Sequence, residues 1–260
     1  MTITRAAVLD QLRIALWRSR AGIRPEPDLV GLAVDGLVAG LGGSALAELA
    51  GADRRNSQDV RDLFEEVVLE QGLENPDEQT ALWHLVRLTA RQIVDGTIEP
   101  GRGAAWLWRE AESRAEPEGD LRVFVALASE LEDHPEHAQY YGTEIVREAA
   151  ALLARAKPRQ WLRVQAAPDR PLSRSTTGGY VPIDVGVLHL PAELTADLDR
   201  WSAHWHEVQS ARGFASIPDA ERFVDRGRDL AQRVQTSLGE TWHVEYYPEP
   251  IRPPGVWVRA

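Results

Sequence analysis

The sequence predicts an α+β protein, in which an N-terminal all-α helical domain is followed by a small two-layer α/β module with a mainly antiparallel sheet. Before Lys157, apolar residues recur at helical spacing between short Gly and Pro breaks; after it, aromatic and β-branched residues alternate in runs typical of strands. The charge changes at the same place, because the whole net charge of −11 arises before Lys157. We therefore predict domains at residues 1–156 and 157–260.

Apolar stripes define the helices of the first domain. In one of them Val60, Phe64, Val67 and Val68 share a face, and Gly72 provides the stop. The same pattern predicts helices at 4–19, 27–41, 44–50, 57–71, 77–95, 102–114, 119–132 and 136–156, with ends uncertain by about 2–4 residues. The first helix is basic and has its own apolar face, so we expect it to pack against the acidic body.

The second domain is predicted to contain strands and two helices. Strands are expected at 161–166, within 177–190, at 242–247 and at 256–259, and helices at 192–208 and 218–238. The first of these helices has a seam of apolar residues at Leu194, Leu198, Trp201, Trp205 and Val208. Gly227 falls within the apolar stripe of the second helix, where glycine costs about 1 kcal/mol relative to alanine. We expect a close neighbour at that position.

Composition excludes several classes of function. The chain has no cysteine, which rules out disulfides, thiolate metal sites and a thiol nucleophile. The excess of acidic residues argues against a nucleic-acid partner, since phosphate contacts need a basic face. There is no apolar run of membrane-spanning length and no secretory signal pattern. The sequence therefore predicts a cytoplasmic protein with no membrane partner and no cofactor.

A catalytic site is one alternative reading of the last predicted strand. His243, Glu245 and Tyr247 alternate along it and share one face, which would place a base, an acid and a phenol on an open polar sheet face. Arg163 lies beside them if its strand pairs there. This set predicts a small-molecule hydrolase or transferase as the alternative function.

The hydroxyl-rich stretch at residues 173–179 is a candidate to assist that site. Its hydroxyls, backbone N–H groups and Arg174 suit an anion. It lacks the lysine and the spacing of a phosphate loop, so a flexible turn between strands is the favoured interpretation.

A metal site is the alternative reading of the segment around Pro135. His134, His137 and Asp133 offer nitrogen and oxygen ligands for a divalent ion. Pro135 is favoured at the first position of a helix, which makes His134 a cap and separates the two imidazoles. We therefore favour a polar helix start and assign no metal.

Acidic side chains on outward helix faces are the preferred candidates for partner binding. They form two clusters, and the residues chosen are Asp59, Asp62, Glu66, Glu70, Glu130, Glu132 and Asp133. A field of this sign attracts a basic protein partner. In its general character as an acidic, helical, cysteine-free chain, the protein is similar to bacterial immunity proteins that neutralise basic toxins. This resemblance implies a non-enzymatic interaction protein, of immunity or inhibitor type.

Overall fold

The computed structural model describes residues 3–24, 27–167, 170–176, 179–248 and 251. It confirms the α+β class, with helices throughout and a small mixed sheet in the C-terminal part. The chain divides into two compact units: unit 1 holds Met1–Ala111 and His134–Leu153, and unit 2 holds Glu112–Asp133 and Ala154–Ala260. Unit 2 thus includes residues that precede the predicted boundary at 156. The predicted strand at 256–259 lies outside the described residues.

Unit 1 is helical. Its helices are α1 (Arg5–Arg20), α2 (Leu29–Val38), α3 (Ser44–Gly51), α4 (Ser57–Glu70), α5 (Glu78–Val94), α6 (Pro100–Trp106) and all but the last residue of α8 (Ala138–Ala154). A π-helical segment, Leu107–Glu112, follows α6 directly. Side-chain caps explain several of the starts: Asn56 accepts from the backbone N–H of Asp59 at α4, and Asp77 accepts from that of Thr80 at α5.

The basic N-terminal helix packs within unit 1, as expected. Leu12 and Leu16 are fully buried, and the Trp17 ring stacks on His84 of α5 with the ring centroids 4.5 Å apart. The Arg20 guanidinium donates two hydrogen bonds, of 2.7 and 2.5 Å, to the carboxylate of Glu65 in α4. Burial of the apolar face and this bidentate ion pair together hold α1 against α4 and α5.

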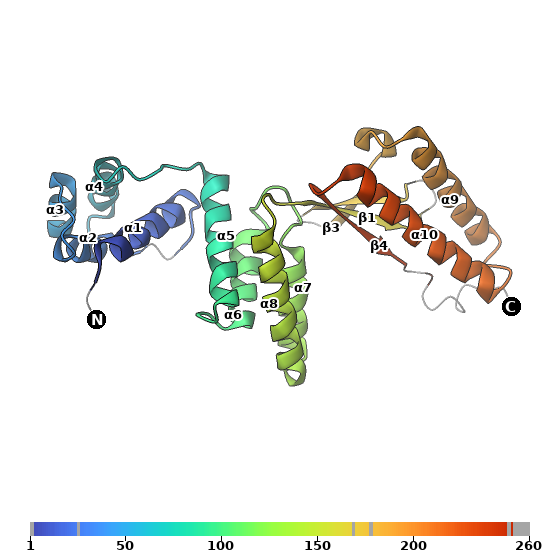
Figure 1. The fold of residues 1–260 in the computed structure, drawn as a ribbon, viewed down its shortest axis with the longest axis horizontal. Helices are drawn as coiled ribbons and strands as arrows, with labels where there is room; N and C mark the ends of the chain where they lie inside the picture. Colours follow the sequence, from blue (N-terminus) through green and yellow to red (C-terminus); the bar gives the residue numbers. More distant parts are fainter. Residues whose placement is uncertain (1–2, 25–26, 168–169, 177–178, 249–250, 252–260) are drawn as a thin grey trace. The chain divides into compact units, whose positions relative to one another are not determined.

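Unit 2 contains the sheet. Its elements are α7 (Arg122–Asp133), β1 (Gln160–Gln165), β2 (Leu172–Thr176), β3 (Gly179–Pro182), α9 (Ala192–Ser210), α10 (Ile217–Leu238) and β4 (Trp242–Tyr247), drawn in Figure 1. The strand order is β3-β2-β1-β4. β2 pairs antiparallel with both β1 and β3, whereas β4 pairs parallel with β1. Strand β2 corrects the interpretation of residues 173–179 as a turn, because Ser173 to Thr176 belong to a strand.

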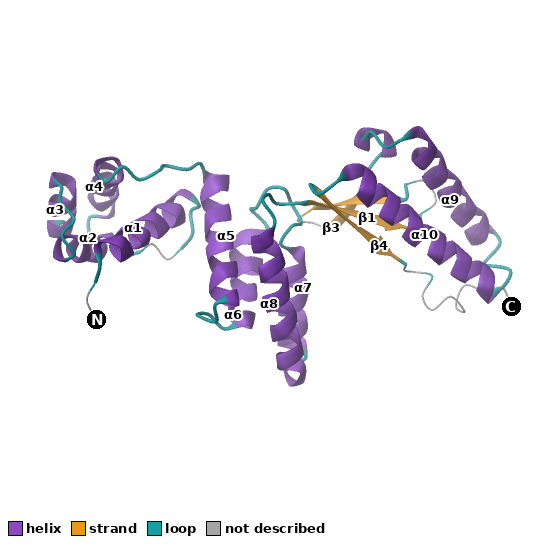
Figure 2. Ribbon diagram, in the orientation of Figure 1, coloured by secondary structure: helices purple, strands orange, loops and turns teal. Residues whose placement is uncertain are grey.

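Helices α9 and α10 cover one face of this sheet. Figure 2 shows both helices beside the strands, and their apolar seams share one core with Leu162, Val164 and Leu172. The close approach expected at Gly227 is present. A Cβ atom there would lie 2.5 Å from Cε2 of Tyr246 in β4 and 2.7 Å from Cζ2 of Trp201 in α9. The absence of a side chain at this position therefore lets three elements meet.

Candidate functional site

The opposite face of the sheet brings the predicted catalytic residues together. Because β1 and β4 are parallel neighbours, Arg163 lies beside Glu245 and Trp161 beside His243. The Nε atom of Arg163 is 2.7 Å from Oε1 of Glu245. The Arg163 guanidinium also lies over the Tyr247 ring, 4.2 Å from its centroid. The pairing foreseen for Arg163 is therefore real.

Sequence reasoning missed a further member of this group, Tyr180 in the edge strand β3. Its ring centroid lies 3.6 Å from the Arg163 guanidinium, so this cation is held between two tyrosine rings, those of Tyr180 and Tyr247. Burial, with a hydrogen bond to Glu245, raises the pKa of Tyr180 to about 12. The phenol is neutral at physiological pH, and the Glu245 carboxylate is already occupied by Arg163 and Tyr180. This arrangement links the sheet's edge strands.

The polar face is open only in part, which corrects the expectation of a solvated surface. His243 lies against Trp161, with ring centroids 4.2 Å apart, and burial together with the charge of Arg159 lowers its pKa. The Trp161 indole N–H donates to Oδ1 of Asp120, which precedes α7. Ser173 and Ser175 are 1% exposed, and Gly119 lies directly over Ser175. The segment before α7 thus covers this end of the sheet.

The two histidines considered for a metal site lie around one carboxylate. Pro135–His137 is a short 3₁₀ helix, with His134 as its cap residue. Oε1 of Glu136 lies 3.3 Å from Nδ1 of His134 and 3.9 Å from Nε2 of His137. Among the described residues, no group of three or more His, Asp or Glu side chains has a metal-holding arrangement. The 3₁₀ start at Pro135 agrees with the favoured polar helix start, and metal binding by Asp133, His134 and His137 stays an untested alternative.

All four predicted acids on α4 are exposed, but the Glu70 carboxylate is held by hydrogen bonds to α3. The other three are Asp59, Asp62 and Glu66. Glu70 accepts hydrogen bonds from the first backbone N–H groups of α3, at 2.7 Å from Ser44 and 3.3 Å from Leu46. Desolvation opposes the shift, yet these bonds together lower the pKa of Glu70. Glu70 therefore acts as a cap for α3.

The second predicted acidic cluster lies on α7, where Glu130, Glu132 and Asp133 are exposed. Since α7 belongs to unit 2, the two clusters are in different compact units. By sequence, unit 1 has 13 basic and 20 acidic residues, a net charge of −7, and unit 2 has 16 and 20, a net charge of −4. The acidic surplus is shared between the units.

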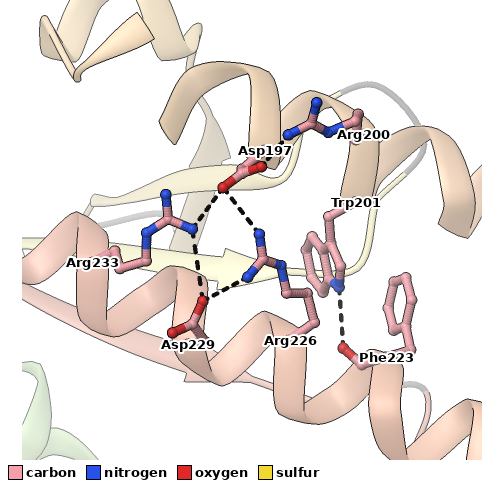
Figure 3. Close-up of polar contacts among 7 residues, drawn as sticks. All are labelled: Asp197, Arg200, Trp201, Phe223, Arg226, Asp229 and Arg233. Carbon is pink, nitrogen blue, oxygen red and sulfur yellow. Dashed lines mark hydrogen bonds and ion pairs between the residues drawn. The ribbon is translucent and has the colours of Figure 1, made fainter. Parts of the chain in front are cut away.

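A site that the sequence analysis did not identify lies between α9 and α10. Asp197, whose side chain is only 9% exposed, accepts from three arginines (Figure 3). Arg200 lies on its own helix, while Arg226 and Arg233 reach it from α10 at 2.9 and 2.6 Å. These hydrogen bonds, led by those from Arg233 and Arg200, lower the pKa of Asp197 to about 2. One buried carboxylate thus joins the two helices.

A cleft of about 530 Å³ opens beside this ion-pair network. Apolar and aromatic side chains that include Trp201, Phe214 and Phe223 line it, and the arginines Arg200 and Arg222 lie on it as well. Figure 3 shows the Trp201 indole N–H directed at the carbonyl oxygen of Phe223, a hydrogen bond of 3.1 Å. The two rings stack with their centroids 4.7 Å apart. The hydrogen bond and the ring stacking therefore fix Trp201 and Phe223, which form the floor of the cleft together with Phe214.

The sequence contained a usable signal for this site. Asp197 lies next to the buried seam residue Leu198, and a carboxylate so close to an apolar stripe needs partners. Arg226, Asp229 and Arg233 follow at helical spacing on the next helix. Their meeting depended on how the two helices cross, which the sequence pattern left open.

The fold defines an α+β protein of two compact units. Residues 160–249, about a third of the chain, match the family model described as Serratia CdiI immunity protein-like. The matched segment begins at the first residue of β1 and ends just after β4, so it spans the whole sheet and both covering helices. This match supports an immunity-type role in protein interaction.

No curated protein and no solved structure matches the chain. Among the described residues, no helix has the length and apolar character needed to cross a membrane.

Proposed function

We propose that this protein is an immunity-type protein, which binds a toxin protein and blocks its action. The observation that carries the proposal is the match of residues 160–249 to an immunity protein-like family. It covers β1–β4, α9 and α10, a unit of structure with its own core. Agreement between the matched segment and this packed module supports a transfer of the family's role to unit 2.

We further propose that the toxin partner is basic and that the acidic residues of the helical part attract it in the cytoplasm. Asp59, Asp62 and Glu66 support this, because they are exposed on one helix and bear one sign of charge. The exposed acids of α7 give unit 2 an anionic surface of its own, which can attract a basic partner independently of α4. Charges of this kind accelerate encounter with an oppositely charged partner and make the rate depend on salt.

Co-expression tests the proposed function. The chain is expressed in cells together with a growth-inhibiting protein encoded by a gene directly beside its own, and growth is compared with that of cells lacking the chain. We expect restored growth and a stable complex of the two purified proteins. Undiminished toxicity and absence of a complex at low ionic strength would refute an immunity role.

The finer proposal about charge has its own test. In the triple variant D59K/E66K/D62K, the association rate with that toxin should fall about tenfold at low salt and lose much of its salt dependence. The matched control is E136Q, which alters an exposed acid away from α4. An unchanged rate in the triple variant would show that the α4 acids do not attract the partner.

A further inference from the structure

The cleft between α9 and α10 has the composition of a binding hot spot. Its floor combines Trp201, Phe214 and Phe223, and tryptophan and arginine are the residues most enriched where interfaces gain their affinity. The floor is preorganised, since Phe223 lies within 5.4 Å of Phe214 and 4.7 Å of Trp201, centroid to centroid. An apolar side chain can therefore enter with little ordering of the floor.

The rim of the cleft is cationic. Arg200 and Arg222 have side chains 73% and 72% exposed, and each donates to an aspartate, Asp197 or Asp219, through Nη2. A guanidinium carries five N–H donors, so a single such bond leaves donors that face solvent in these exposed groups. Both can thus form a bidentate pair with an added carboxylate.

The charge balance of the cleft favours an anionic group. Three arginines line it, Arg200, Arg222 and Arg226, against the two aspartates Asp197 and Asp219. Asp197 also serves Arg233, which approaches it from outside the lining set. Asp229 also lies outside that set and pairs with both Arg226 and Arg233, so these two outer charges cancel and the cleft keeps an excess of one arginine over its aspartates.

Resting on the proposed function, we propose that this cleft docks a segment of the toxin partner in which an apolar side chain lies next to a carboxylate. The apolar side chain packs on Trp201 and Phe223, and the carboxylate binds Arg200 and Arg222. Two features favour a protein segment: the cleft lies wholly within residues 160–249, and its apolar floor and charged rim suit a side chain with a charged neighbour. A toxin that is basic overall would thus present a local acidic site here.

Charge reversal at the rim tests the proposal. The double variant R200E/R222E is compared with R228E, which changes an exposed arginine of α10 that pairs with Asp225 and does not line the cleft. Binding of the purified toxin encoded by the neighbouring gene is measured by calorimetry. We expect the dissociation constant to rise at least tenfold in R200E/R222E and to change less than twofold in R228E.

A second variant tests the apolar floor without changing charge. Ala215 is exposed and lines the cleft, so A215W fills the opening and should also weaken binding at least tenfold. Circular dichroism spectra and melting curves like those of the wild type establish that both variants fold.

The outcomes separate the two proposals. A wild-type protein that neither binds the toxin nor protects cells overturns the proposed function and the docking site with it. A wild-type protein that binds, while R200E/R222E and A215W bind equally well, overturns only the docking site.

Discussion

The two units of this protein differ in whether they bury carboxylates. In unit 1 the described buried polar residues consist of Thr89 alone, and acids such as Asp59 and Glu66 point into solvent. In unit 2 the described buried polar residues include two carboxylates, Asp120 and Asp197, each with arginine partners. Unit 1 therefore joins α1 to α4 by the partly exposed Arg20–Glu65 pair, whereas unit 2 joins its elements through carboxylates that are themselves buried.

This difference shows that counting charges along the sequence predicts the surface charge of unit 1 better than that of unit 2. Outward acids on α4 stay outward because their helix buries a single apolar stripe. In unit 2, residues far apart in sequence share one network, as when Arg226 and Arg233 meet Asp197. Such pairing neutralises charges that a running sum treats as free.

Glycine substitution gives the largest expected contrast, between one closely packed position in unit 2 and one open position in unit 1. In G227A the new methyl group meets ring carbons of Tyr246 and Trp201, and overpacking should reduce the free energy of unfolding by about 2 kcal/mol. In G142A, on α8 of unit 1, the methyl group meets open space, and stability should rise by about 0.5–1 kcal/mol. Urea denaturation measures both. Equal and small effects would contradict the close packing inferred for unit 2.

The network at Asp197 should produce the next largest effect. Its pKa is about 2 in the folded protein against an ordinary value of 3.8, so the unfolded chain takes up the proton first on acidification. The stability that Asp197 provides is complete above about pH 4 and is lost as pH falls towards 2. We expect D197N to melt at a lower temperature than the wild type at pH 7 and to lose less between pH 4 and 2.

The control for this variant is D225N, which changes an exposed carboxylate on α10 that pairs only with Arg228 among the ion pairs described here. Thermal melting of D225N should follow the wild type across the whole pH range. If D197N also followed it, the carboxylate would not hold the two helices together.

Substitution of His243 should change the pH dependence of the melting temperature less than substitution of Asp197 does, and at a higher pH. Burial and the charge of Arg159 lower its pKa below 6.5, so the unfolded chain binds a proton more readily than the folded one. The stability that neutral His243 contributes to the fold is present above about pH 6.5 and is lost as pH falls. Acidification from pH 7 to 5 should lower the melting temperature less in H243Q than in the wild type. H206Q, at an exposed histidine, should behave like the wild type.

Removal of the cap of α3 should change stability least, and it tests the assignment of Glu70 on α4 as that cap. E70Q weakens the bonds to the N–H groups of Ser44 and Leu46, so hydrogen exchange at the start of α3 should quicken with a slight loss of melting temperature. E66Q, an exposed neighbour on the same helix, should leave exchange unchanged. Identical exchange in both variants would return Glu70 to the set of free surface acids.

Most of the fold could be predicted because the signals for a helix, its apolar spacing and its end residues, lie close together in the sequence. The stripe of Phe64, Val67 and Val68 and the stop after residue 71 fix α4 to within a residue or two. Gly227 was also interpretable, since a glycine inside a buried stripe implies a close neighbour. Strand β2 was missed because Ser173, Arg174 and Ser175 look like turn residues, and only pairing on both sides makes them a strand.

The candidate sites were predicted less well, because each depends on contacts between distant segments. The alternation of His243, Glu245 and Tyr247 placed them on one face, and Arg163 joined them as foreseen. Asp120 and Gly119 contact Trp161 and Ser175 on the same face of the sheet, and they come from a segment 41 residues before Trp161 that carries no strand pattern. Whether the exposed acids on α4 and α7 bind a partner stays a prediction, and catalysis around Glu245 stays the untested alternative.

The interleaved order of the two units has a practical consequence for dissecting the molecule. Residues 112–133 belong to unit 2, yet residues 134–153 return the chain to unit 1 before the sheet begins. A fragment cut to residues 160–249 would leave behind Asp120, and with it the carboxylate that receives the Trp161 indole N–H. The bared end of the sheet would expose Ser173, Ser175 and the Trp161 ring to water. A fragment begun at residue 112 keeps Asp120 but carries α8, with buried Ile145 and Leu152, away from the rest of unit 1, so the whole chain is the better unit to express.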